Sequence, residues 1–262
     1  MSPLELSLAF HALAPHVLSV MLICSRLLPV AFLCPVLGGS QVPSSVKLGL
    51  VLTLGMSLHV LGGVELGELP RSNLALLALS VRELGLGVLV GLIAGLPFDA
   101  ARMAGRFIDL LRGTSAESFN PVSGTRESAA GDMLHQLILT LASVGIVLPL
   151  LLTALFRSFA LVKLGGYVLS EPAALQVATL AGTAMGTGLA VGAPVAAVTL
   201  ATDCMMGLLS RAVPQLNLKD LGAPLKILGG GSVLWLSVGV VSTRLLENAA
   251  RAAVEMTRVL GG

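Results

Sequence analysis

The sequence predicts an all-α protein of the integral-membrane type, with about six long hydrophobic helical segments, some of them kinked or hairpin-like. Of its 262 residues, 55% are hydrophobic and only 11% are charged, whereas about a quarter of the residues in a soluble domain carry a charge. The mean hydropathy is +0.93. Apolar runs of helical length alternate with short polar or turn-forming segments. This pattern predicts helices that cross a membrane or lie among partner subunits.

Composition and motifs exclude several classes of function. The formal net charge of +2 argues against nucleic acid as a partner, because nucleic acid requires a concentrated basic face. No sequence motif of a metalloprotease, serine hydrolase, nucleotide-binding or dinucleotide-binding protein is present, so we predict that the chain is not an enzyme. The four histidines are too scattered along the sequence to indicate a metal site, and we expect no metal and no cofactor.

The first two apolar segments are the least regular. The segment from about residue 4 to residue 37 is interrupted by prolines and by Arg26, so it would cross a bilayer only if it bends. His11 and His16 are candidate proton carriers, although such residues more often lie at helix ends. A turn-rich stretch, GGSQVPSSVK, separates this segment from a second apolar run over residues 48–61.

The third run, residues 74–98, contains adjacent charges at Arg82 and Glu83. Side chains one residue apart point about 100° away from each other on a helix, so these two do not face each other. Because a charge inside a membrane is costly unless it is paired, we expect each of them to find a partner on another segment. Glycines repeat every four residues along the same run and predict the close approach of another helix: Gly87, Gly91 and Gly95.

Two polar segments follow the third run. Residues 99–109 place two Asp/Arg pairs on one helix face, which indicates either a solvated helix extension or a polar wall along an aqueous path or subunit contact. Residues 113–132 are predicted to form a polar loop, because small and turn-forming residues dominate them. Phe119 is the single aromatic residue of this loop. It is either an anchor onto the body of the protein or an obstruction to a passage.

The remaining runs complete the predicted helices. Residues 133–156 carry no charge and form the clearest span by length, with a kink expected at Pro149. Residues 172–202 are charge-free, rich in small residues and longer than a simple span needs, so a kinked or hairpin-like form is expected near Pro194. A sixth run covers residues 227–243. The tail, residues 244–262, predicts an amphipathic C-terminal helix with its charges on one stripe.

The stretch DCMMGLLSRAVPQLNLKDLGAPLK, residues 203–226, is the most polar interruption in the last third of the chain. Together with the ten apolar residues before it, it resembles the signature of the FliR/SctT family of bacterial type III export-apparatus proteins. The positions that carry this resemblance are Asp203, Gly207, Arg211, Pro214, Gln215, Leu216, Asn217, Pro224 and Lys226. Similarity also extends to the RLLP motif that begins at Arg26, to Arg82-Glu83 and to the glycines that follow them, so it covers nearly the whole chain.

The resemblance implies a function. Proteins of this family contribute to a conical export gate in the bacterial inner membrane, through which unfolded substrates pass into a flagellum or an injectisome. The implied partners are two other small export-gate membrane proteins, a larger export-gate switch protein, the unfolded secreted substrates and the lipid membrane. A loop of the family's subunit helps to close the channel, and the matching candidate residues are Ser115, Ser118, Phe119, Asn120 and Pro121.

The sequence therefore predicts one helical export-gate domain over residues 1–262, with a multi-pass topology in the bacterial inner membrane. The signature positions are interpreted as a packing and assembly motif, and Arg82 and Glu83 as intramembrane charge-pairing residues. The alternative hypothesis is a secondary transporter or ion-coupled carrier, which would use these charges or the histidines as a relay. Against it, the two halves of the sequence show no matching broken helices and no inverted repeat.

Overall fold

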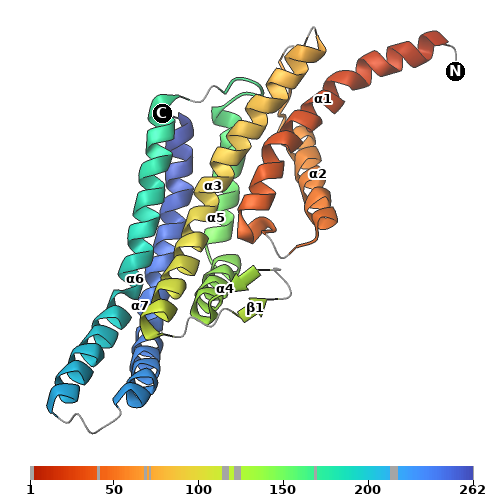
Figure 1. Ribbon diagram of the computed structural model, residues 1–262. Coiled ribbons are helices and arrows are strands. Elements are labelled where there is room, and N and C mark those ends of the chain that lie inside the picture. Colours follow the sequence, from red (N-terminus) through yellow and green to blue (C-terminus); the bar gives the residue numbers. More distant parts are fainter. Residues whose placement is uncertain are drawn as a thin grey trace. The chain divides into compact units, whose positions relative to one another are not determined.

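Helices dominate the protein (Figure 1). The computed structural model describes residues 3–39, 42–67, 70, 72–113, 118–120, 125–167, 170–212 and 218–261. Within these ranges the chain forms seven α-helices, one short 3₁₀ helix and one two-stranded sheet, which confirms the predicted all-α class. In chain order they are α1 (Pro3–Leu33), η1 (Pro35–Leu37), α2 (Ser44–Val60), α3 (Asn73–Arg112), β1 (Ser118–Asn120), β2 (Thr125–Glu127), α4 (Ala129–Val144), α5 (Val147–Leu161), α6 (Glu171–Ala212) and α7 (Leu218–Gly261).

Internal contacts divide the chain into two compact units. The first unit comprises residues 1–95, 146–180 and 250–262, and the second comprises residues 96–145 and 181–249. Three helices, α3, α6 and α7, contribute to both units. The expected organisation as one domain stays a prediction.

The core of the first unit is built where α1 meets α3. A Cβ atom added to Gly87 would lie 2.2 Å from the carbonyl oxygen of Arg26, and one added to Gly95 would lie 2.8 Å from the carbonyl oxygen of Leu33. Gly91 likewise faces the backbone of Val30. The glycine stripe therefore lets α3 approach the backbone of α1 closely, as a small-xxx-small pattern should. The predicted close helix contact is confirmed, and α1 is the partner.

The apolar run expected to be the clearest span is interrupted. It forms α4 and α5, separated at Gly145 and Ile146, and the two helices count as one broken candidate span. The break precedes Pro149, which lies in the first turn of α5. A proline there removes no intrahelical hydrogen bond, since the first N–H groups of a helix have no partner within it. The two helices are bent by 73° at this break, so the kink expected from Pro149 lies one turn before that residue, at Gly145 and Ile146.

In the second unit, α6 packs against α3 through glycines. Cβ atoms added to Gly188 and Gly192 would lie 2.8 Å from the carbonyl oxygen of Ala100 and 2.6 Å from the ring of Phe107, respectively. In contrast, Gly182 and Gly186 have no such neighbour within 4 Å. Helix α6 continues through Pro194 to Ala212 and forms no hairpin.

Helix α7 joins two elements that the sequence suggested were separate. The sixth run and the amphipathic tail form one continuous helix. Gly230 lies inside it, where an added Cβ would lie 2.9 Å from the side chain of Arg112. This glycine thus leaves room for an arginine. In the tail, the charged side chains of Arg244, Glu247 and Arg251 are exposed, whereas the opposite face is buried.

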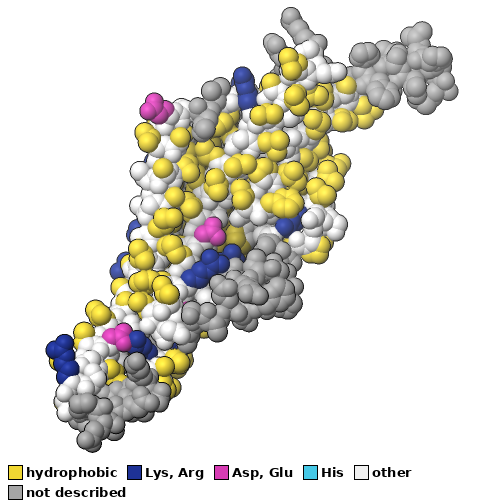
Figure 2. Space-filling view, in the orientation of Figure 1, with side chains coloured by type: hydrophobic (Ala, Val, Ile, Leu, Met, Phe, Trp, Pro, Cys, Tyr) yellow, Lys and Arg dark blue, Asp and Glu magenta, His cyan; other side chains and the backbone are white. Residues whose placement is uncertain are grey.

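The apolar surface of the protein is extensive. Figure 2 shows hydrophobic side chains spread over much of one face with only a few charged side chains among them. Trp235 and Leu236 on α7 are each 75% exposed. In the part of the chain that the structure describes, four helices are long and apolar enough to cross a membrane, or five if α4 and α5 form one span. Such a surface requires lipid or neighbouring subunits to cover it.

The contact between α1 and α3 yields a test. We expect Gly87→Ala to destabilise the protein by about 1–3 kcal/mol, because the new methyl group overpacks a backbone contact. Gly85→Ala is the matched control: it lies on the same helix with no neighbour within 4 Å of an added Cβ, and alanine favours a helix over glycine. Retention of a monodisperse species after heating in detergent measures the difference. Equal thermal stability of the two variants would contradict this account.

Candidate functional site

The most deeply buried charges of the first unit form one ion pair. Arg26 of α1 and Glu83 of α3 are both 0% exposed. The Nε atom of Arg26 donates to Oε2 of Glu83 at 2.6 Å, and Nη2 donates to Oε1 at 3.1 Å. This bidentate geometry is the strongest way for a guanidinium to bind a carboxylate. The pair joins two of the candidate spans. Both side chains are fully buried, so either charge without the other would be energetically costly.

Helix α5 completes the environment of Arg26. Nη1 donates to the carbonyl oxygen of Ser158 at 3.0 Å, and Nη2 donates to the carbonyl oxygen of Val162 at 3.1 Å. Val162 caps the C-terminal end of α5, where unpaired carbonyl groups favour a positive charge. The guanidinium also lies 4.3 Å from the ring centre of Phe159, an arrangement typical of a cation–π contact. Arg26 therefore neutralises a helix end as well as a carboxylate.

Glu83 accepts a further hydrogen bond from the loop after α5. The backbone N–H of Gly165 donates to its Oε1 at 2.6 Å. Gly165 has a φ of +76°, a conformation that glycine adopts at little cost. We call Arg26, Glu83 and the backbone groups of Ser158, Val162 and Gly165 the charge cluster. It connects α1, α3, the end of α5 and the following loop within one unit.

Arg82 differs from its neighbour in sequence. Its side chain is exposed, and Nη1 donates to the carbonyl oxygen of Gly165 at 3.4 Å. It lies at the edge of a cavity of about 520 Å³ with mostly apolar walls, next to Tyr167. Burial raises the pKa of the Tyr167 phenol. The sequence predicted that Arg82 and Glu83 both pair with other segments. Glu83 belongs to the buried charge cluster, whereas Arg82 lies on the protein surface beside it.

The candidate plug lies on a small hairpin in the second unit. Strands β1 and β2 pair antiparallel, with Phe119 opposite Arg126 and Asn120 opposite Thr125. Ser118 also belongs to β1. Ser115 and Pro121 lie outside the described residues.

The chain that leaves this hairpin is fixed to α3. The backbone N–H of Ala130 donates to Oδ2 of Asp109 at 2.8 Å. A Cβ added to Gly105 would lie 2.3 Å from the carbonyl carbon of Ala130, so α3 and the start of α4 are in backbone contact. Ser128 caps α4 by accepting a hydrogen bond from the N–H of Gly131 at 3.0 Å. The chain that leaves the hairpin is therefore held to α3 by one buried hydrogen bond and one backbone contact.

The signature positions lie around the turn between α6 and α7. Asp203 of α6 forms an ion pair with Lys226 of α7, which links the two helices. Gly207 and Arg211 are exposed on α6, and Pro224 is exposed inside α7. Pro214, Gln215 and Asn217 lie outside the described residues. In the single chain, Arg211 is thus available to a neighbour.

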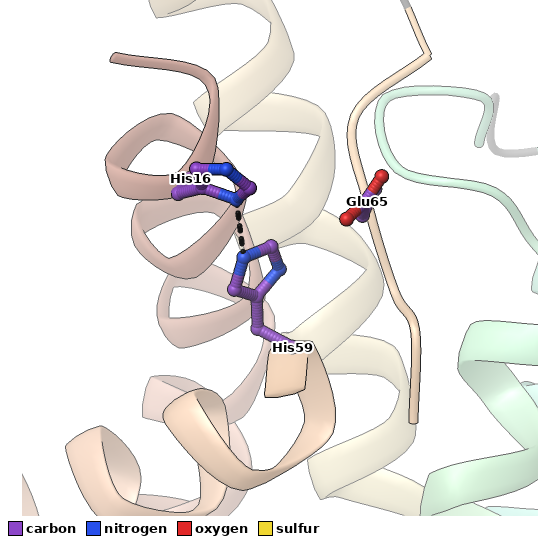
Figure 3. A group of neighbouring side chains, drawn as sticks. All are labelled: His16, His59 and Glu65. Carbon is purple, nitrogen blue, oxygen red and sulfur yellow. Dashed lines mark hydrogen bonds between the residues drawn. The ribbon is translucent and has the colours of Figure 1, made fainter. Parts of the chain in front are cut away.

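Sequence reasoning missed two groupings. It treated Arg26 as part of a family pattern and did not connect it to Glu83, which lies 57 residues later. It also treated the histidines as scattered, yet His16 and His59 lie together with Glu65 (Figure 3). Neither grouping could be found from local spacing, since in each case the residues come from different segments of the chain.

These features define a class: a multi-pass helical membrane protein with a large apolar surface and a buried charge cluster between its helices. The chain belongs to the family described as Bacterial export proteins, family 1, whose sequence pattern matches residues 17–251. This confirms the resemblance to the FliR/SctT family. Members of the family are export-apparatus proteins of the inner membrane, and the predicted multi-pass location in that membrane is confirmed.

Relatives come from both flagellar and secretion systems. The chain is 27% identical over 210 residues to the flagellar biosynthetic protein FliR of Escherichia coli, an alignment that covers 80% of each chain. It is 25% identical over 240 residues to the surface presentation of antigens protein SpaR of Salmonella typhimurium, covering 89% of this chain and 86% of that one. It is also 26% identical over 180 residues to the Yop proteins translocation protein T of Yersinia pestis, covering 68% and 67%.

The charge cluster gives a second test. We expect Glu83→Leu to destabilise the protein by about 3–5 kcal/mol, because it leaves a buried arginine without its carboxylate. The double variant Arg26→Met/Glu83→Leu should recover much of this loss, since it removes both charges. Arg82→Gln, at the adjacent exposed position, should have little effect. Thermal stability in detergent measures all three, and a Glu83→Leu protein as stable as the wild type would disprove the role of the pair.

Proposed function

We propose that this chain is a structural and gating subunit of the bacterial type III protein export channel. It would help to form the conduit for unfolded substrates and to close it at rest. Membership of the export-apparatus family supports the structural part of this proposal. The observation that carries the gating part is the polar hairpin of β1 and β2, which is fixed at its base to α3 through Asp109 and Gly105.

A fixed base is what an obstructing loop requires. A loop with loose ends would be carried away by a passing substrate, whereas contacts at the base return it to the same place. Backbone packing at Gly105 and the hydrogen bond to Asp109 supply such contacts. Phe119 lies in β1 and is the bulky apolar residue of the segment. Apolar constrictions can close a pore by excluding water.

A single bulky residue is a small obstruction. We therefore propose that residues Ser115, Ser118, Phe119, Asn120 and Pro121 close the channel together with loops of other subunits. The proposed partners are two other small export-gate membrane proteins and the larger switch protein. The extensive exposed apolar surface of α6 and α7 needs a cover, and we propose that these partner subunits provide a large part of it.

The gating proposal predicts a leak. Deleting residues 115–120 in the assembled complex should raise the passage of small ions across the inner membrane, because the obstruction is removed while the base remains. Phe119→Ser should produce a smaller leak of the same kind. Membrane conductance, followed with a potential-sensitive dye in vesicles, measures both. An unchanged conductance in a deletion complex that assembles normally would reject the gating role.

The signature positions suggest a separate role in assembly. We propose that Arg211, exposed at the end of α6, binds a neighbouring subunit through its guanidinium. Arg211→Ala should then lower the yield of the complex with co-expressed partner proteins by several-fold, while Arg211→Lys should lower it less because the charge is kept. Purification of the complex through a tag on a partner measures the yield. A normal yield with Arg211→Ala would show that the residue is dispensable for assembly.

A further inference from the structure

Beyond the export role, we propose that His16, His59 and Glu65 form a binding site for a late first-row divalent metal ion such as Zn²⁺. The three side chains come from α1, from α2 and from the segment after α2, all within the first unit. One ligand atom from each lies within 4.8 Å of the others. Figure 3 shows the two imidazole rings in contact and the Glu65 carboxylate beside them.

The distance between the two imidazoles fits a shared ion. His16 Nδ1 lies 3.0 Å from His59 Nε2. Two nitrogens that each bind one metal at about 2.1 Å are 3.0 Å apart when the angle at the metal is about 90°, and about 3.4 Å apart when it is tetrahedral. The pair therefore needs to move by only a few tenths of an ångström. In the metal-free protein a proton lies between these two nitrogens, which form an N–H···N hydrogen bond.

The backbone holds His59 in the tautomer that a metal requires. Its Nδ1 lies 2.9 Å from the carbonyl oxygen of Val64. A carbonyl oxygen can only accept, so Nδ1 carries the proton, and in the neutral ring Nε2 presents its lone pair toward His16. Metal-binding histidines in proteins commonly donate their other ring N–H to a backbone carbonyl or carboxylate in this way.

A second hydrogen bond places Glu65 next to α1. The N–H of Leu66 donates to the hydroxyl of Ser19 at 3.0 Å, and this hydroxyl donates to the carbonyl oxygen of Pro15 at 2.8 Å. Ser19 itself is buried, with 2% of its surface exposed. Ser19 lies about one turn after His16 on α1, and Leu66 directly follows Glu65 in the chain. The exposed Glu65 side chain needs to shift by about an ångström to complete a three-ligand site.

The ligand set favours particular ions. Two imidazoles and one carboxylate suit Zn²⁺, Ni²⁺ and Cu²⁺ and are poor ligands for Mg²⁺ or Ca²⁺, which prefer oxygen. His16 and Glu65 are exposed, so an ion can reach the site and water can fill its open positions. A bound ion would join α1, α2 and the following segment. The site would act as a structural cross-link at one end of the α1–α2 pair.

Metal binding can be measured on the full-length chain. The protein is purified in detergent with a tag that contains no histidine, and bound metal is removed with a chelator. Zn²⁺ is then titrated in competition with a chromophoric chelator, and Co²⁺ is added separately to record its visible absorption. We expect one Zn²⁺ per chain, and a Co²⁺ spectrum with a nitrogen contribution.

Variants then assign the ligands. His16→Gln and His59→Gln should each weaken Zn²⁺ binding by at least about 100-fold, because changing a group that only hydrogen-bonds to a metal ligand already costs about 10–100-fold. Glu65→Gln should weaken it less, and Glu65→His should strengthen it by supplying a third imidazole. The Glu65→His gain cannot arise from misfolding, so it keeps the test valid if a histidine variant is unstable. Glu171→Gln, at an exposed carboxylate on α6, is the matched control and should bind as the wild type does.

Two results would overturn the proposal. One is a wild-type chain that binds no more Zn²⁺ than the double variant His16→Gln/His59→Gln. The other is binding that persists unchanged in all four site variants, which would place the metal elsewhere. In the first case His16 and His59 form a hydrogen-bonded pair and no metal site.

Discussion

The structure of the first unit depends on the ion pair between Arg26 and Glu83. Removing two charges from water costs several kcal/mol for each ion, and their attraction repays this only when the remaining polar atoms are also satisfied. Here they are satisfied by the carbonyl groups of Ser158 and Val162 and by the N–H of Gly165. The Arg26–Glu83 pair of α1 and α3 therefore also fixes the position of α5 and of the loop that follows it.

The glycines of α3 make this pair geometrically possible. Gly87 lies against the backbone of Arg26 itself, so the two helices are closest where the charges meet. A larger residue at this position would separate the helices and stretch a hydrogen bond of 2.6 Å. Close packing and charge pairing therefore depend on each other. Gly87 sets the distance between α1 and α3, and the Arg26–Glu83 pair sets how each helix is rotated about its own axis.

The sequence predicted the class, the helices and the need for a partner for Glu83, because hydropathy and the cost of a buried charge are local properties. It could not predict Arg26 as that partner, since the two lie 57 residues apart and only tertiary packing brings them together. The position of the break was hidden for another reason: residues 133–156 carry no charge, so hydropathy does not mark where the first of the two helices ends. The β1–β2 hairpin could not be predicted, because strands of three residues are too short to show an alternation of apolar and polar side chains.

The charge cluster also bears on how the protein enters the membrane. Synthesis proceeds from the N-terminus, so Arg26 is made before Glu83, and α5 with its carbonyl groups is made last of the three. An unpaired arginine or acidic residue at the centre of a spanning helix costs about 2.5–3.5 kcal/mol on insertion scales. Neither α1 nor α3 therefore reaches its lowest free energy in lipid before the other is present. Pairing therefore lowers the free energy of both helices at once, and α5, which follows both in the chain, adds the carbonyl groups that complete the environment of Arg26.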